Sequence, residues 1–307
     1  MIPREIIRKV RKIEIVTRHY VQDQMAGAYH SIFKGAGIAF EEVRPYQVGD
    51  DIRLIDWNVS ARMSDVFVKL FVEEREMTVM LLVDVSGSLA FGSASSTKRE
   101  IAAEIAALLS FSAIENNDRV GLIMFSDRIE RFIPPKKGRK HVLRVVVDLL
   151  GAAPPEGRGT DIEVALDYLG HVTKRRCVAF LMSDFQAAGW ESALKRIARR
   201  HDIIPIEIRD PRERHAEAEA GDGAEGGLVP MGVVLVEDPE TGEAVWLDTD
   251  SRRVREAFSR AARREEFDRH EFFRRNKIDY VAVDTSRPYL EPLIRFFRLR
   301  EKRARRV

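Results

Sequence analysis

The sequence predicts an α/β fold: a mostly parallel β-sheet with helices on both of its faces. The first observation is a set of short, continuous apolar runs, such as TVMLLVD (78–84) and CVAFLMS (177–183), which are typical of strands buried on both faces. The second is that these runs alternate with segments of helical spacing, as in βαβ units. The third is the length of 307 residues, which leaves room for a smaller part beside one sheet domain.

The elements follow in order from residue 78. Thr97 and Glu100 form a capping box, in which a hydroxyl residue precedes an acid by three positions, so a helix is expected to begin there. Thr160 and Glu163 form a second box. The segment 129–134 follows a polar turn and is expected to pair with the preceding strand as a hairpin. Strands are expected at 78–84, 120–126, 129–134, 177–183, 202–210 and 279–285, and helices after Thr97, at about 139–151, from Thr160 to about 172, at about 189–201 and at about 251–275.

Two regions depart from this alternation. Residues 26–77 are rich in glycine, aromatic and charged residues and contain alternating stretches such as VFVKLFVEE (66–74), which predict a small β-rich extension. Residues 212–228 are rich in glycine, alanine and glutamate and predict an exposed loop. We therefore expect an N-terminal helix and β-rich extension at 1–76, and a sheet domain at 77–307 that carries the loop.

The N-terminal segment MIPREIIRKVRKIEIVTRHY places apolar residues on one face of a helix. Docking of this face on the protein's own core is one interpretation. Because basic residues are interspersed, a helix lying on a membrane surface is the other. The segment has no apolar core of the signal-peptide type, and the chain has no run near the ~18 apolar residues of a membrane span.

Composition excludes several classes of function. The 51 Lys and Arg residues balance 49 Asp and Glu residues, so the net charge of +2 gives no general attraction to nucleic acid or to an anionic membrane. The single cysteine, Cys177, excludes an internal disulfide and lies in an apolar run where a buried, inert thiol is expected. This favours a reducing compartment, so a cytoplasmic location is expected. The histidines lack zinc-site spacing and no P-loop is present, so neither a zinc hydrolase nor an ATPase is expected.

Oxygen-bearing side chains follow the ends of the predicted strands. Asp84 ends one strand, Ser86 and Ser88 follow at alternate positions, Thr160 precedes a helix, and Asp184 follows another strand. Because ligands bind beyond the carboxyl ends of parallel strands, we expect these side chains to converge. Two carboxylates and three hydroxyls without His or Cys form a hard oxygen set that suits Mg²⁺ or Mn²⁺. The alternative is that the three hydroxyl residues are only turn residues and helix caps.

Three loops resemble the metal-ion-dependent adhesion site of von Willebrand factor A domains: DVSGS (84–88), GRGTD (157–161) and LMSDF (181–185). The resemblance covers about residues 77–210 and implies a von Willebrand A-like sheet. It also implies that Ser86, Ser88 and Thr160 are direct or nearly direct metal ligands. Asp84 and Asp184 would hold the metal partly through water, and one coordination position would stay open for an acidic residue of another protein.

A longer segment resembles the signature of the family called domain of unknown function fifty-eight: GAGIAFEEVRPYQVGDDIRLIDWNVSARMSDVFVKLFVEE (35–74). The resemblance implies a von Willebrand A-like domain behind this segment and, because members often lie beside MoxR-type AAA+ ATPases in bacterial operons, a partner role. Charged residues and a tryptophan either fix the extension to the sheet domain, with the tryptophan ring buried, or form a partner-binding surface. They are Arg44, Asp50, Asp51, Arg53, Asp56, Trp57 and Arg62.

Two functions of different class are therefore expected. The first is a metal-dependent protein-binding module without enzymatic activity, an adaptor or co-chaperone partner of a MoxR-type ATPase that binds an acidic residue of its partner through the metal. The alternative is a Mg²⁺-dependent phosphohydrolase with Asp84 as its nucleophile. Haloacid-dehalogenase-like enzymes place a second Asp two residues after the nucleophile, where this chain has Ser86, and this favours the first. The basic tail RFFRLREKRARRV is expected to be a solvated helix end and not a nucleic-acid site, while peripheral membrane contact stays open.

Overall fold

The structure is a computed structural model, and it describes residues 10, 39–63, 65–72, 76–90, 92, 96–152, 159–210, 230–237 and 244–304. The chain divides into two compact units. We call Phe33–Met77 the small unit, and Met1–Ile32 together with Thr78–Val307 the sheet unit. The division at Met77 falls directly before the first strand of the large sheet.

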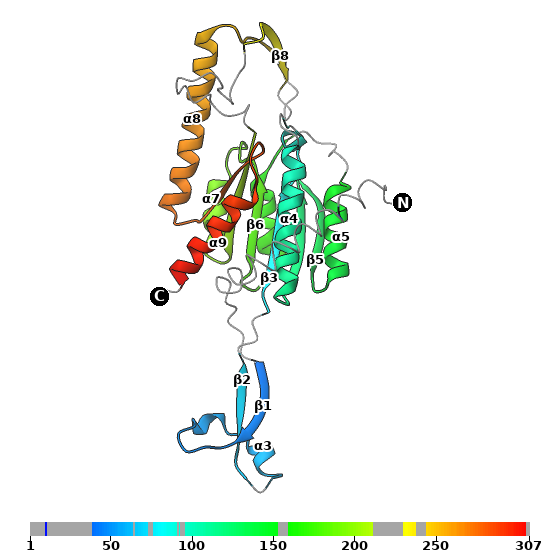
Figure 1. The fold of residues 1–307 in the computed structure, drawn as a ribbon, viewed down its shortest axis with the longest axis vertical. Helices are drawn as coiled ribbons and strands as arrows, with labels where there is room; N and C mark the ends of the chain where they lie inside the picture. Colours follow the sequence, from blue (N-terminus) through cyan, green and yellow to red (C-terminus); the bar gives the residue numbers. More distant parts are fainter. Residues whose placement is uncertain are drawn as a thin grey trace. The chain divides into compact units, whose positions relative to one another are not determined.

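The sheet unit contains a six-stranded sheet in the order β10-β7-β6-β3-β4-β5 (Figure 1). Its strands are β3 (Thr78–Asp84), β4 (Arg119–Phe125), β5 (Ile129–Lys136), β6 (Val178–Ser183), β7 (Asp202–Arg209) and β10 (Val281–Asp284). Neighbouring strands are parallel, except that β5 runs antiparallel to β4 as its hairpin partner. The predicted α/β fold with a mostly parallel sheet is confirmed.

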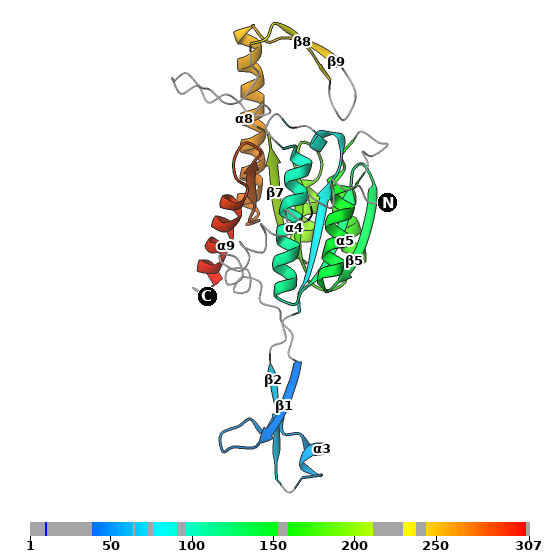
Figure 2. The ribbon, with the colours of Figure 1, turned by 45° about the vertical axis from the view of Figure 1, so that its right-hand side comes forward.

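The apolar runs form strands because helices cover both faces of this sheet. The helices are α4 (Lys98–Glu115), α5 (Arg139–Leu150), α6 (Ile162–Val172), α7 (Glu191–Ala198), α8 (Arg252–Arg275) and α9 (Leu290–Ala304). Met80 and Leu82 of β3 pack into a core cluster with residues of α6 and α7. Side chains alternate along a strand, so Leu81 and Val83 face the opposite side, where α4 and α5 lie together (Figures 1 and 2).

The helix starts test the two predicted capping boxes. The first is confirmed: Thr97 Oγ1 accepts from the N–H of Glu100, and the Glu100 carboxylate accepts from the N–H of Thr97. The second is wrong, because the N-cap of α6 is Asp161 and not Thr160. The Asp161 carboxylate accepts from the N–H of Val164 at 3.2 Å, and an aspartate is as good a cap as a threonine.

One element was not predicted, and some predicted elements lie outside the described residues. A hairpin of β8 (Val233–Glu237) and β9 (Ala244–Asp248) was not predicted from the sequence. The predicted loop at 212–228 and all of the N-terminal helix except Val10 lie outside the described residues. Val10 itself is helical and 6% exposed. Along the described ranges, no helix combines the length and the hydrophobicity needed to cross a membrane.

The small unit is a two-stranded antiparallel sheet with two short helical turns. Its elements are β1 (Ala39–Pro45), the 3₁₀ turn η2 (Ile52–Leu54), α3 (Trp57–Ser60) and β2 (Phe67–Val72). This is the β-rich extension that the alternating stretch predicted. It has few buried side chains among its described residues, with Val68 at 2% exposed as the main one.

The single cysteine is buried as predicted. Cys177 precedes β6, is 3% exposed and has its Sγ 3.2 Å from Nδ1 of His201. Burial, with the nearby charge of Asp202, raises the pKa of the thiol to about 12. Because only the thiolate is a strong nucleophile, this cysteine belongs to the fold and not to a reactive site.

Candidate functional site at the switch point of the sheet

The order of the strands creates a switch point in the sheet, between β3 and β6. From β3 the chain continues through β4 and β5 on one side, while β6, β7 and β10 extend the sheet on the other. The direction of winding therefore reverses between β3 and β6, and ligands of such sheets bind at this switch point, beyond the carboxyl ends of the strands. Asp84 is the last residue of β3, and Asp184 follows the last residue of β6.

Asp84 is the centre of a buried hydrogen-bonded cluster. Its side chain is 0% exposed. Oδ1 accepts from the N–H of Ser86 at 2.9 Å, and Oδ2 accepts from the hydroxyl of Ser183 at 2.7 Å. The hydroxyls of Ser86 and Ser88 lie 3.1 Å apart and are also buried. The structure thus brings Asp84, Ser86 and Ser88 together as the sequence predicted, and it adds Ser183, which the sequence analysis did not single out.

The pKa of the Asp84 carboxyl is raised, because its hydrogen bonds do not offset burial and a neighbouring carboxylate. Burial raises the pKa of its carboxyl, and the charge of Asp184 raises it further, to about 7. Hydrogen bonds from Ser86 and Ser183 act in the opposite direction but do not offset these effects. Two carboxylates in one dry site resist simultaneous ionisation unless a cation lies beside them.

The loop after β6 holds Asp184 in place through a strained turn. Phe185 has a φ of 55°, in the left-handed region that a bulky residue rarely adopts. Its N–H donates to the Ser183 hydroxyl at 3.1 Å, and its ring packs edge-on against Trp190 and Phe273. These contacts over-determine the turn and aim Asp184 at the start of α4.

A lysine supplies the cation at this site. Lys98 is the first residue of α4, and its Nζ donates to Oδ2 of Asp184 at 2.8 Å. The side chains of Lys98 and Asp184 are 0% and 2% exposed, respectively. Lysine is almost never fully buried unless it is paired. No local pattern in the sequence distinguishes Lys98 from other first-turn lysines such as Lys140 of α5.

The presence of Lys98 bears on the predicted metal ion. An ammonium and a divalent cation that both need Asp184 Oδ2 repel each other strongly in a buried site. An ion bound at that oxygen would therefore have to displace the Lys98 ammonium. Within the described ranges, no three His, Cys, Asp or Glu side chains gather in a group that could hold a metal. The ion stays a prediction.

Thr160 occupies a loop that is tied to the end of β4. The N–H of Asp161 donates to the carbonyl of Ser126 at 2.8 Å, and Thr160 itself is half-buried. Because Asp161 caps α6, the Thr160 hydroxyl has no capping role. Gly157 and Arg158 of the same motif lie outside the described residues.

A second buried charge cluster lies on β7, the neighbour of β6. Glu207 is 0% exposed and accepts from Arg269 Nε at 2.6 Å, from Arg209 and from His270 Nε2 at 3.1 Å. Burial by itself would raise the pKa of Glu207, but the hydrogen bond from His270 and the charges of Arg209 and Arg269 lower it to about 2. A cavity of about 50 Å³, lined by Asp184, Arg209 and Arg269 among others, lies between this cluster and the switch point.

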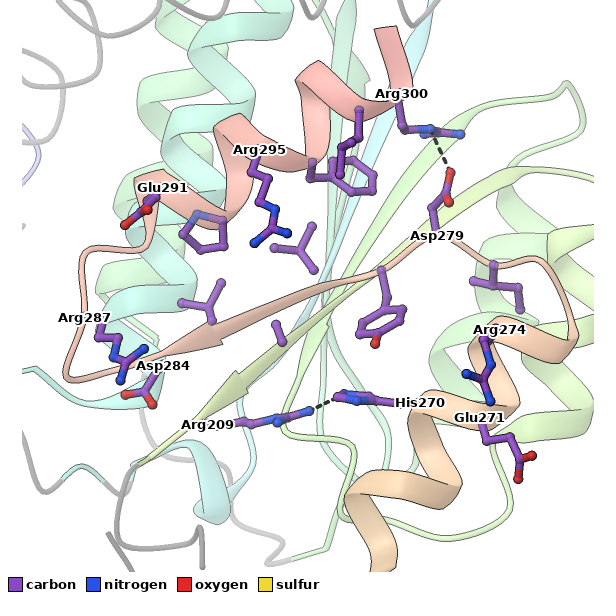
Figure 3. Close-up of a pocket in the computed structure, with 18 of the residues that line it drawn as sticks. Arg209, His270, Glu271, Arg274, Asp279, Asp284, Arg287, Glu291, Arg295 and Arg300 are labelled. Atoms are coloured by element: carbon purple, nitrogen blue, oxygen red, sulfur yellow. Dashed lines mark hydrogen bonds and ion pairs between the residues drawn. The ribbon is translucent and has the colours of Figure 1, made fainter. Parts of the chain in front are cut away.

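A larger cleft lies beside β10, between α8 and α9 (Figure 3). Its volume is about 1220 Å³. Arg300 pairs with Asp202 at 2.8 Å and with Asp279 at 3.2 Å, whereas Arg274, Arg287 and Arg295 form no ion pair with any residue that the structure describes. The cleft shares Arg209 with the Glu207 cluster and takes no residue from the Asp84 cluster.

In the small unit, the acidic residues of the signature segment have local partners. Asp50 forms a two-pronged ion pair with Arg44 at 2.8 and 2.6 Å, which holds the pKa of Asp50 below its usual value. Asp51 caps η2 by accepting from the N–H of Arg53. Asp56 caps α3 and lies 3.5 Å from Lys69. These contacts stabilise the turns of the unit itself.

The remaining members of that set are exposed. Trp57 is 69% exposed, so its ring is not buried within the small unit. Arg53 and Arg62 are also exposed, and neither side chain forms an ion pair with the part of the chain described here. The seven residues thus separate into four that shape the small unit and three that its surface presents to solvent.

The strand order and the Asp84 cluster at its switch point define an α/β protein of the von Willebrand A-like class. The chain belongs to the family described as Protein of unknown function DUF58, which matches residues 42–268. It is 30% identical over 299 residues to the uncharacterised proteins Mb1516 of Mycobacterium bovis and Rv1480 of Mycobacterium tuberculosis, which covers 96% of this chain and 90% of each relative.

Two solved structures show further similarity. An aerotolerance-related membrane protein from Bacteroides fragilis aligns with a TM-score of 0.47 at 16% identity, over 74% of this chain and 99% of that one. The von Willebrand A domain of SpRpn10 aligns with a TM-score of 0.33 at 18% identity, over 43% of this chain and 75% of that one.

Proposed function

We propose that this protein is a protein-binding module of the bacterial cytoplasm, an adaptor or co-chaperone partner of a MoxR-type AAA+ ATPase. The observation that carries the proposal is the exposed apolar surface of the small unit. Its members are Val48, Ile52, Leu54, Trp57, Met63 and Val66, with exposed fractions of 101, 68, 39, 69, 55 and 42%. Exposed apolar residues concentrated in one short segment mark interaction sites.

The composition of this segment supports a contact that depends on a few residues. Tryptophan and arginine are the residues most enriched at the energetic centres of protein interfaces. The side chains of Trp57, Arg53 and Arg62 are exposed, and those of the two arginines form no ion pair with the described residues of the small unit. In the segment that resembles the family signature, the acidic residues therefore stabilise its own turns, while its tryptophan and two of its arginines are available to contact a partner.

The Asp84 cluster supports a binding role over phosphoryl transfer. A nucleophilic carboxylate must reach an incoming phosphorus atom, but Asp84 is fully buried and both of its oxygens already accept hydrogen bonds. Haloacid-dehalogenase-like enzymes also need a second Asp two residues after the nucleophile, and this chain has Ser86 there. The proposal does not depend on a metal ion at this cluster, because Lys98 pairs with Asp184.

The test is a binding measurement with two matched tryptophan variants. Trp57 and Trp246 are 69% and 67% exposed, but Trp246 lies on the β8–β9 hairpin. We expect Trp57→Ala to weaken binding of the full chain to the MoxR-type ATPase of the same organism at least about tenfold, since truncation of a central tryptophan costs roughly 2 kcal/mol or more. Trp246→Ala should bind like the wild type. Because both rings are exposed, both variants should keep the wild-type melting temperature.

Different results would contradict different parts of the proposal. Wild-type affinity of Trp57→Ala would place the contact outside the small unit. Binding of the wild-type chain is measured without nucleotide, with ADP and with a slowly hydrolysed ATP analogue. If the ATPase binds in none of these three conditions, it is excluded as the direct partner. Turnover of a generic phosphate ester that is lost in Asp84→Asn would instead favour the hydrolase.

A further inference from the structure

The candidate metal site of this protein contains a positive charge of its own. Lys98 and Asp184 are separated by 86 positions in the sequence, yet Nζ and Oδ2 lie 2.8 Å apart in a fully buried setting. The ammonium thus occupies the side of Asp184 that faces the start of α4. Asp184 belongs to the oxygen set from which the metal was predicted, whereas Lys98 does not.

The charges of the site show what Lys98 contributes. Asp84 and Asp184 carry two negative charges when both are ionised, and Ser86, Ser88 and Ser183 offer only neutral hydroxyls. A divalent ion would balance both charges by itself. Lys98 balances one of them, and with Lys98 in place a divalent ion would bring two positive charges where one negative charge is left, beside an ammonium that repels it.

We propose that Lys98 is the resident cation of the switch-point site, in place of a divalent metal ion. The side chain reaches the loop after β6 from the first turn of α4 and locks these two segments together without an exchangeable ligand. Mg²⁺ or Mn²⁺ can then enter only if Lys98 leaves. This inference concerns the site alone and holds whichever partner the protein binds.

The experiment is a titration of the full chain with Mn²⁺ by calorimetry, for the wild type and for Lys98→Met. Methionine keeps the length and the apolar stem of the lysine but removes its charge. Lys140→Met is the matched control, since Lys140 is also a first-turn lysine, on α5, but is exposed. We expect no saturable binding in the micromolar range for the wild type and for Lys140→Met. Lys98→Met should bind Mn²⁺ at least about tenfold more tightly.

A second readout separates the site from any other metal-binding surface. Chelator and excess Mg²⁺ should leave the melting temperature of the wild type unchanged. Lys98→Met should melt at a lower temperature than Lys140→Met, and Mg²⁺ should raise it again. The double variant Lys98→Met/Asp184→Asn should lose the gained Mn²⁺ binding, because the ion then lacks one of the two carboxylates of the site.

Saturable micromolar binding of Mn²⁺ by the wild type would overturn the proposal, and this result does not require any variant to fold. The proposal would also fail if neither chain bound the ion, because the oxygen cluster freed of its ammonium should take it up. If Lys98→Met does not fold, Lys98→Gln, which is neutral and polar, replaces it in the same comparison.

Discussion

Two carboxylates in one sheet, Asp84 on β3 and Glu207 on β7, are equally buried, and yet their pKa values are shifted in opposite directions. Both side chains are 0% exposed. Glu207 contacts two guanidinium groups and an imidazole, and its pKa is lowered to about 2. Asp84 contacts two serines and lies near a second carboxylate, and its pKa is raised to about 7.

Burial raises the pKa of both acids, and the comparison shows that the surrounding cations decide whether this effect is offset. The Glu207 cluster has enough positive charge to be a structural junction between β7 and α8. The Asp84 cluster has two acids and only Lys98, so it remains short of positive charge. A site of the second kind responds to protons and to the loss of its one cation.

The largest effect is expected from Glu207→Gln, which removes the charge that Arg209 and Arg269 surround. Two buried guanidinium groups would then lose their shared carboxylate, and breaking a buried pair costs about 3–5 kcal/mol. Urea unfolding at neutral pH measures this loss. Glu256→Gln is the control, since Glu256 pairs with Arg252 on the exposed surface of α8, where such pairs are worth less than about 1 kcal/mol.

Equal, small losses in Glu207→Gln and Glu256→Gln would break the comparison. They would mean that solvent reaches Arg209 and Arg269 once the carboxylate is gone. Arg209 also pairs with Glu266, so Glu207→Gln/Glu266→Gln should lose more stability than Glu207→Gln alone.

At the Asp84 cluster, the same change from an acid to an amide is expected to raise the stability of the protein. Asp84→Asn keeps an acceptor for the N–H of Ser86 and offers an amide to Ser183, but it removes one of two neighbouring negative charges. At pH 8, in the presence of chelator, we expect the variant to be about 1–3 kcal/mol more stable than the wild type. A loss of stability would mean that the ionised form of Asp84 is favoured by contacts stronger than its repulsion from Asp184.

The fold was largely predictable from the sequence, for a physical reason. Strands such as β3 and β6 are buried on both faces, so each is a continuous apolar run whose signal is complete within about seven residues. The hairpin of β8 and β9 has no such signal. Its apolar residues Val233, Leu235 and Trp246 are 63, 53 and 67% exposed, so no burial pattern marks them.

The candidate site was predictable only in its local part. Asp84, Ser86 and Ser88 are close in sequence and form a pattern, and Asp184 follows a comparable strand. Lys98 pairs across 86 positions, and no local spacing can show such a contact. The capping function of Thr160 was predicted wrongly because Asp161, one residue later, satisfies the same rule.

The Glu207 cluster could have been noticed in the sequence. Glu207 and Arg209 stand at alternate positions of an otherwise apolar strand, so they share one face of the sheet. Charged residues in a strand that is buried on both faces need partners. Those partners, Arg269 and His270, lie on α8 more than sixty positions away, which is why only the structure identifies them.

The smallest expected effect is a difference in how stability depends on pH. A carboxyl whose pKa is raised in the folded state holds its proton while the unfolded chain has already released it. Asp84 should therefore lower the free energy of unfolding as pH rises from about 4 to about 7, by at most about 1.4 kcal/mol per pH unit. Glu207 has a lowered pKa, so its contribution is complete above about pH 4.5 and is lost as pH falls toward about 2.

Urea unfolding of the wild type, Asp84→Asn and Glu207→Gln across this range, in chelator, checks both signs. The advantage of Asp84→Asn should vanish near pH 4, and the deficit of Glu207→Gln should shrink only below pH 4.5. Parallel curves for the wild type and Asp84→Asn would show that Lys98 and the serines already hold Asp84 in its ionised form, so that the two buried acids differ less than their surroundings indicate.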